Sequence, residues 1–223
     1  MTNREKYILS IYEELSDMGK HENVKLVKNT VNDGIYIKKT LKNYNIEIYK
    51  ILKNRQIKGI PKVYEIIEDE KELIIIEEYI HGLTLDKKYN KTDVETVKKI
   101  MEQLCNILKQ LHNMNPPIIH RDIKPTNIMV SNDDVVYLVD FNISREYDEN
   151  QSVDTVIMGT QGYASPEQCG FAQTDCRSDI YSIGMLMKNI LMVDEYPDKE
   201  TKRLKRIIDK CTSIDPGKRY KNI

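Results

Sequence analysis

The chain has 223 residues, 40% of them hydrophobic, which allows one large domain or two lobes that share a cleft. Its 34 lysines and arginines balance 35 aspartates and glutamates, so the net charge is -1. Without a general basic field, neither nucleic acid nor an anionic membrane is expected as a main partner.

The four cysteines and four histidines are scattered and form no C-x-x-C pair, so a zinc site is not expected. No apolar run approaches the roughly 20 residues that span a bilayer, and the N-terminal stretch MTNREKYILSIYEEL lacks the apolar core of a signal peptide. The sequence therefore predicts a soluble, cytoplasmic domain, with a membrane tether or sensor domain outside these residues left open.

Residues 15–79 contain short apolar runs separated by turn-forming residues. Each run is bounded by turn signals and predicts a strand of an antiparallel sheet. The runs are VKLV at 24–27, GIYI at 34–37, VYEII at 63–67 and LIIIEEYI at 73–80. One helix is expected among them at 45–53, where apolar residues recur at helical spacing.

From residue 82 onward the apolar pattern is mainly helical. Residues 94–114 carry an apolar stripe about six turns long, which predicts a core helix. Two short strands and two helices are expected after it, at 128–130, 135–139, 178–193 and 201–211. The expected α+β layout is a small sheet lobe at about 1–79, a hinge at about 78–84 and a larger, mostly helical lobe at about 85–223, with a cleft between the lobes.

The densest polar group of the second lobe is the segment IIHRDIKPTNIMV at 118–130. Asp122, Lys124 and Asn127 lie close together in it, and Pro125 favours an irregular loop, so several hydrogen-bonding groups can meet at one point. A capped turn with a buried histidine is the alternative explanation for any one of these residues alone. A further carboxylate, Asp140, closes the apolar run VVYLV, where it has no evident packing role.

Taken together, these residues resemble the catalytic loop of eukaryotic-type (Hanks-type) serine/threonine protein kinases, whose H-R-D-x-K-x-x-N motif is matched from His120 to Asn127. The resemblance is to the bacterial members, runs from about Tyr12 to Tyr220, and implies the bilobal protein kinase fold over 1–223. The other motifs follow in the family's order: Asp140-Phe141, Ser165-Pro166-Glu167, Asp179-x-x-Ser-x-Gly184 and Asp215-Pro216-x-x-Arg219.

The resemblance implies a role for each polar residue of the loop. Asp122 is expected to accept or orient the proton of the substrate hydroxyl, while Asn127 and Asp140 hold Mg²⁺, with Mn²⁺ as an alternative, against the phosphates of ATP. Lys124 is expected near the transferring phosphate, a position that in this family indicates serine and threonine substrates. Thr160, in GTQGYASPE, resembles the threonine that supports Asp122 and Lys124.

The family's phosphate-gripping lysine falls on Lys38 or Lys39 of the predicted strand GIYIKKTL. Side chains alternate across a strand, so Lys39 brings Ile37 over the adenine, whereas Lys38 brings the bulkier Tyr36. Lys39 is therefore favoured. Its predicted helix partner is Glu47, the only acidic residue of the helix at 45–53, although a solvated helix face is the alternative for Glu47.

Residues 77–80 resemble the family's hinge, which implies that the backbone groups of Glu78 and Ile80 meet the edge of the adenine. Glu77 then stands at the back of the nucleotide pocket, where apolar residues are commoner. Of the family's phosphate-covering G-x-G-x-x-G-x-V, only Gly19 and Val24 are kept. Because glycines let backbone amides approach the phosphates closely, this loss predicts a looser grip on ATP.

Three further expectations follow from the resemblance. Arg121 implies control by phosphorylation of the activation segment, with Ser144, Ser152, Thr155 and Thr160 as candidates and Ser152 or Thr155 as the regulatory sites. Glu167 and Arg219 are expected to form a structural ion pair. The family has a glycine at position 142 for a turn with a positive φ, and Asn142 is among the few other residues that tolerate that conformation.

Three functions compete on these observations. The leading one is an active, ATP- and Mg²⁺-dependent kinase that phosphorylates serine and threonine hydroxyls of protein substrates. A pseudokinase is favoured by the glycine-poor loop and Asn142, and an aminoglycoside- or choline-type phosphotransferase by the short C-terminal lobe. The short lobe fits either a natural short kinase or a truncated chain; the physiological substrate, activating signal and oligomeric state are not predicted.

Overall fold

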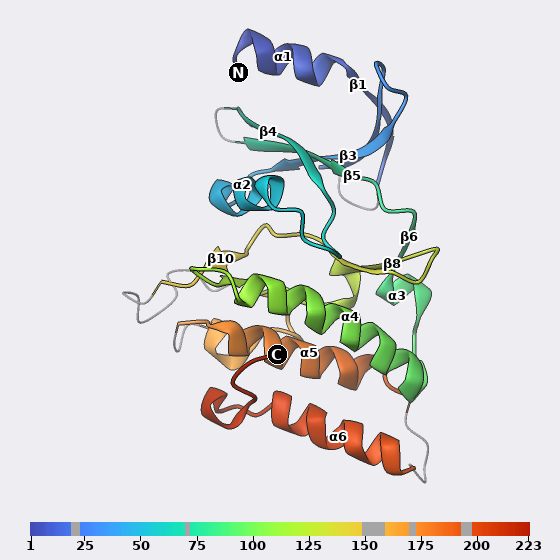
Figure 1. Ribbon diagram of the computed structural model, residues 1–223, viewed down its shortest axis with the longest axis vertical. Coiled ribbons are helices and arrows are strands. Elements are labelled where there is room, and N and C mark those ends of the chain that lie inside the picture. The colour runs from blue at the N-terminus through green and yellow to red at the C-terminus, as the bar shows by residue number, and fades with distance from the viewer. Residues whose placement is uncertain (19–22, 70–71, 149–158, 170–172, 193–197) are drawn as a thin grey trace. The chain divides into compact units, whose positions relative to one another are not determined.

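The computed structural model describes residues 1–18, 23–69, 72–148, 159–169, 173–192 and 198–223 (Figure 1). The chain divides into two compact units, Met1–His81 and Gly82–Ile223, and their boundary falls within the stretch predicted as the hinge. The first unit is rich in strands and the second in helices, which confirms the predicted α+β class.

The first unit is built on a five-stranded antiparallel sheet in the order β1-β2-β3-β5-β4. Helix α2, Ile46–Asn54, starts where the side chain of Asn45 accepts a hydrogen bond from the Glu47 N–H, and it contacts β4. The strands are β1 Tyr12–Asp17, β2 Val24–Asn29, β3 Ile35–Leu41, β4 Val63–Asp69 and β5 Glu72–Glu78. All four predicted strands and the predicted helix are therefore present.

Two elements of the first unit were not predicted, helix α1 at Asn3–Ser10 and strand β1. Helix α1 buries none of its residues and is stabilised by a capping box, in which Thr2 and Glu5 exchange hydrogen bonds. All but one of the residues of β1 are exposed. Neither element carries the apolar periodicity from which a helix or a strand is predicted.

The second unit is organised around helix α4, Val94–His112, whose apolar stripe is buried against neighbouring elements. Helices α5, Cys176–Ile190, and α6, Lys199–Cys211, lie beside it (Figure 1). The shorter elements are β6 Gly82–Thr84, α3 Leu85–Lys88, β7 Ile118–Ile119, β8 Ile128–Ser131, β9 Val136–Leu138, β10 Arg145–Glu146 and 3₁₀ turns at Pro125–Asn127, Pro166–Cys169 and Pro216–Lys218. In the described ranges, no helix combines the length and apolar character needed to cross a membrane.

Candidate active site

Three side chains of the second unit meet around the carboxylate of Asp122. The Asn127 amide donates to Asp122 Oδ2 at 2.8 Å, and Thr160 Oγ1 donates to Asp122 Oδ1 at 2.7 Å. The Lys124 ammonium lies 2.7 Å from Asp122 Oδ2 and donates to Thr160 Oγ1 at 2.8 Å. Both carboxylate oxygens are thus oriented by donors, and the predicted contact of Thr160 with Asp122 and Lys124 is present.

The β8–β9 hairpin brings Asp140 to the same end of the loop. Ile128 pairs with Leu138 in the ladder, and one step further the Val139 N–H donates to the Asn127 carbonyl at 2.9 Å. Asp140 is the residue directly after Val139 in the chain. The two side chains predicted to bind the metal therefore leave adjacent strand ends.

Two non-glycine residues of this loop region have a left-handed backbone, Arg121 with φ 70° and Asp140 with φ 68°. Such a conformation costs roughly 1–3 kcal/mol and gathers at functional sites, where the surrounding structure holds it. Asn142 is not among the positive-φ residues of the described chain. Its N–H instead closes a turn on Asp140 Oδ1 at 3.4 Å, so the expected positive φ at position 142 is wrong and falls on Asp140.

This backbone makes Asn142→Gly a test of the turn. Glycine gains nothing where φ is negative, so we expect the variant to lose about 0.5–1 kcal/mol of the free energy of unfolding through chain entropy, measured by urea titration. Asp33→Gly is the matched control: Asp33 has φ 58° in an exposed turn, which glycine favours, and this gain should offset the loss of its exposed ion pair with Lys28, which is worth little. A stabilising Asn142→Gly would mean that position 142 needs the left-handed conformation after all.

The buried carboxylate of Asp179 in α5 holds the loop backbone in place. Its Oδ2 accepts the His120 N–H and its Oδ1 the Arg121 N–H, both at 2.9 Å. His112, at the end of α4, contacts Oδ2 through Nε2 at 2.8 Å. Burial alone raises the pKa of Asp179, but the hydrogen bond and charge of His112 outweigh it and hold that pKa below its usual value.

His112 makes stability depend on pH. Burial opposes its charged form, but the hydrogen bond to Asp179, the nearby Cys176 side chain and the Asp179 charge outweigh burial and raise the pKa of His112 to about 10. The stabilisation is therefore fully present below pH 6.5, the ordinary pKa, and is lost as the pH rises toward 10. We expect the excess unfolding free energy of the wild type over His112→Gln to shrink across that window; a constant excess would contradict a charged His112.

The predicted phosphorylation candidates differ in their surroundings. Ser144 is only 2% exposed and its hydroxyl donates to the His120 carbonyl at 3.1 Å, which disfavours it among the candidates. Thr160 is bound to Asp122. Ser152 and Thr155 lie outside the described residues, and their regulatory role stays a prediction.

In the first unit, strand β3 presents Lys38 and Lys39 to opposite faces of the sheet. Lys38 Nζ lies 2.9 Å from the partly exposed Glu14, whereas Lys39 Nζ lies 2.6 Å from Glu77 Oε1. Ile37, on the face of Lys39, is buried. This arrangement agrees with the choice of Lys39 as the site lysine.

The ion pair predicted between Lys39 and Glu47 is not the one in the structure. The Glu47 carboxylate lies 2.7 Å from Lys50 on an exposed side of α2, with the two side chains 58% and 52% exposed. The sheet supplies the partner of Lys39 instead, through Glu77 of β5. The solvated helix face is therefore the better description of Glu47.

The other residues predicted to bind the nucleotide lie in strand β2, at the end of strand β5 and just after it. Val24 pairs with Lys39 in the β2–β3 ladder, so the two side chains share a face. The Glu78 N–H donates to the Lys62 carbonyl at 2.8 Å, and Ile80 is buried. Gly19 lies outside the described residues, and the contacts of these residues with ATP stay predictions.

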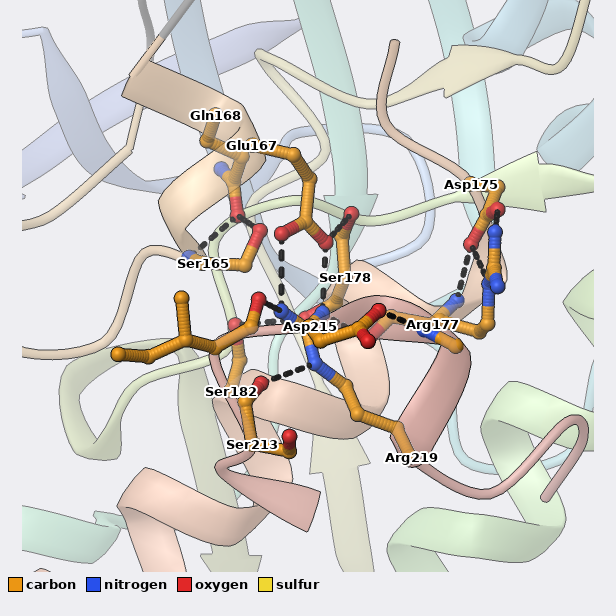
Figure 2. Close-up of polar contacts among 12 residues, drawn as sticks. Ser165, Glu167, Gln168, Asp175, Arg177, Ser178, Ser182, Ser213, Asp215 and Arg219 are labelled. Carbon is orange, nitrogen blue, oxygen red and sulfur yellow. Dashed lines mark hydrogen bonds and ion pairs between the residues drawn. The ribbon is translucent and has the colours of Figure 1, made fainter. Parts of the chain in front are cut away.

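The predicted ion pair between Glu167 and Arg219 is confirmed (Figure 2). Arg219 Nη1 and Nη2 donate to the two carboxylate oxygens at 2.6 and 2.9 Å, and Ser178 Oγ donates to Oε1 at 2.8 Å. Burial alone raises the pKa of Glu167, but these donors outweigh it and lower that pKa. The guanidinium also donates to the carbonyls of Arg177, Ser213 and Ile214, so Arg219 joins three segments of the second unit.

An aspartate oriented by an asparagine, a lysine and a threonine, with a second aspartate at the adjacent strand end, is the arrangement of a phosphotransferase domain. The chain belongs to the protein kinase family, since the family model described as "Protein kinase domain" matches residues 15–221. This match confirms the predicted family and its bilobal α+β fold.

Curated relatives carry serine/threonine kinase names. The chain is 36% identical over 131 residues to a "probable serine/threonine-protein kinase" of Clostridium acetobutylicum, covering 58% of this chain and 20% of that protein. It is 29% identical over 185 residues to serine/threonine-protein kinase D of Synechocystis, covering 72% and 36%, and 36% identical over 121 residues to PknB of Mycobacterium tuberculosis, covering 52% and 19%. The chain thus spans well under half the length of these relatives.

Proposed function

We propose that the chain is an active protein kinase domain that transfers the γ-phosphate of ATP to serine and threonine hydroxyls of proteins. The observation that carries the proposal is the Asp122 network, in which Lys124 and Thr160 are hydrogen-bonded to each other and to the carboxylate. A carboxylate held in this way can accept or orient the proton of an incoming hydroxyl. Lys124 supplies positive charge where charge develops on the transferring group.

The donor set fits a hard divalent cation. The Asn127 Nδ2 donates to Asp122, so the side-chain oxygen Oδ1, which accepts a long 3.5 Å hydrogen bond from Thr126 Oγ1, can face a metal, and Asp140 adds a carboxylate at the adjacent strand end. Oxygen ligands of this kind suit Mg²⁺, with Mn²⁺ as an alternative. When bound, the metal would neutralise charge on the ATP phosphates.

The residues proposed to bind ATP in the first unit are Lys39, Val24, Glu78 and Ile80, with Gly19 in the phosphate-covering loop. Glu47, predicted as the partner of Lys39, has no such assignment here, because its carboxylate pairs with Lys50. The proposed setting is the cytoplasm, where ATP, Mg²⁺ and protein substrates are at hand, and no role with nucleic acid is proposed.

The proposal is tested by phosphate transfer from labelled ATP. The purified chain is incubated with Mg²⁺, Mn²⁺ or a chelator, with generic protein substrates, and the labelled residues are mapped. We expect metal-dependent labelling of serine and threonine, with Asp122→Ala defining the background. Wild-type labelling no higher than that background would support the pseudokinase instead, and transfer to aminoglycosides or choline alone would support the small-molecule phosphotransferase.

A further inference from the structure

Glu77 is the residue of the site that the family pattern leaves unexplained. We propose that Glu77 is the positioning residue of Lys39, and that it fixes the lysine ammonium for the phosphates of a nucleoside triphosphate without help from helix α2. The inference rests on the proposed function, because it assigns a task to the lysine through which ATP is gripped. In this assignment the partner of Lys39 comes from strand β5, as Glu77, and not from helix α2, as Glu47.

The ladder between β3 and β5 determines which side chains meet. Ile37 lies opposite Glu77 and Lys39 opposite Ile75, so Lys39 and Glu77 are diagonal neighbours on one face of the sheet. Diagonal positions across antiparallel strands lie about 7–8 Å apart, within reach of two long side chains. The ammonium and carboxylate meet at 2.6 Å.

Burial gives this pair its strength. The side chains of Lys39 and Glu77 are 12% and 10% exposed, and the flanking Ile37 and Ile75 are buried. A carboxylate withdrawn from water needs a compensating charge, and the attraction between opposite charges grows as water is excluded. Glu77 therefore holds the Lys39 ammonium at a defined point, where an exposed pair would leave it mobile.

The pair does not depend on α2. Strands β3 and β5 are joined over six residue pairs, so the spacing of Lys39 and Glu77 is set by the sheet itself. The acidic residue of α2, Glu47, is engaged by Lys50 on an exposed helix side. A lysine positioned within the sheet is ready for ATP irrespective of the position of α2.

A double-mutant cycle on the affinity for ATP tests this assignment. The dissociation constant of Mg²⁺-ATP is measured by calorimetry for the wild-type chain, Glu77→Gln, Lys39→Met and the double variant. If Glu77 acts through Lys39, Glu77→Gln should weaken binding about tenfold in the wild type and less than about twofold in the Lys39→Met background. Equal losses in both backgrounds, or tighter binding by Glu77→Gln, would overturn the assignment.

Two control variants test whether the position of the carboxylate matters, and a third variant guards against a folding defect. Glu14→Gln removes the partner of Lys38 on the opposite face and should leave ATP affinity unchanged. Glu47→Gln should cost less affinity than Glu77→Gln, and the reverse order would restore α2 as the source of the partner. If Glu77→Gln does not fold, as a thermal unfolding scan would reveal, Glu77→Asp replaces it, because it keeps the charge and shortens the reach by one methylene.

The outcomes also separate this inference from the proposed function. If the chain binds ATP with the expected coupling but transfers no label, the kinase activity is refuted and the Lys39–Glu77 assignment is supported. If the chain transfers label but the two substitutions have additive effects on ATP affinity, the assignment is refuted and the kinase activity is supported.

Discussion

Replacing Asp122 with asparagine should lower the rate of phosphate transfer by about 10²- to 10⁴-fold, the usual contribution of a positioned general base. Asparagine keeps the size of the side chain and an oxygen that can accept the Thr160 hydroxyl, but it cannot take up a proton and loses the ion pair with Lys124. The affinity for Mg²⁺-ATP should change little. The measurement is initial-rate kinetics at saturating ATP beside calorimetric ATP binding.

The matched control is Asp133→Asn, an exposed aspartate of the β8–β9 turn that lies in the same unit. It should transfer phosphate at the wild-type rate. Transfer by Asp122→Asn at a rate close to the wild type would remove Asp122 from the chemical step. A parallel loss of ATP affinity would instead indicate that the variant has disturbed the loop.

The sequence predicted the catalytic loop well because its polar residues are close neighbours in the chain. Asp122, Lys124 and Asn127 lie within six consecutive residues, so a single turn is enough to bring them together. Thr160 is 36 residues beyond Lys124, and only the family's pattern indicated that the two would meet. The observed hydrogen bond therefore rests on tertiary structure that local spacing does not encode.

The partner of Lys39 was missed for a physical reason. A helix glutamate can be identified from sequence as the only acidic residue of its helix, but a diagonal pair in a sheet depends on the register of two strands. Glu77 had a signal of its own, a charged residue inside the apolar run LIIIEEYI. A carboxylate buried in a strand needs a cation nearby, and that requirement, not applied to Glu77 in the sequence analysis, would have indicated one of the two lysines of β3.

The positive φ of Asp140 was also not predicted from the sequence. Asparagine and glycine tolerate a positive φ, so a positive φ was expected at Asn142. The residue with the left-handed backbone is instead Asp140, two positions earlier. Aspartate tolerates this conformation too, and the Asn142 N–H bonds to its carboxylate. Residue preferences therefore identified the turn but not the residue that bears the strain.

Replacing Arg219 with alanine should cost about 3–5 kcal/mol of the free energy of unfolding, because it leaves the Glu167 carboxylate buried without its cation. Both side chains of the pair are at most 5% exposed, and the guanidinium also loses its bonds to three carbonyls (Figure 2). Urea titration at pH 7 measures the loss. Arg177→Ala is the control, since its pair with Asp175 is partly exposed and should be worth about 1 kcal/mol or less.

The same pair predicts how the loss depends on pH. The folded pKa of Glu167 lies below its ordinary value of 4.5, so the stabilisation is fully present above pH 4.5 and is lost as the pH falls through the folded pKa. The difference between wild type and Arg219→Ala should therefore shrink on acidification. The double variant Arg219→Met/Glu167→Met should recover most of the lost stability, because two apolar side chains leave no buried charge. A double variant no more stable than Arg219→Ala would show that the carbonyl bonds of Arg219, and not its charge pairing with Glu167, carry the stabilisation.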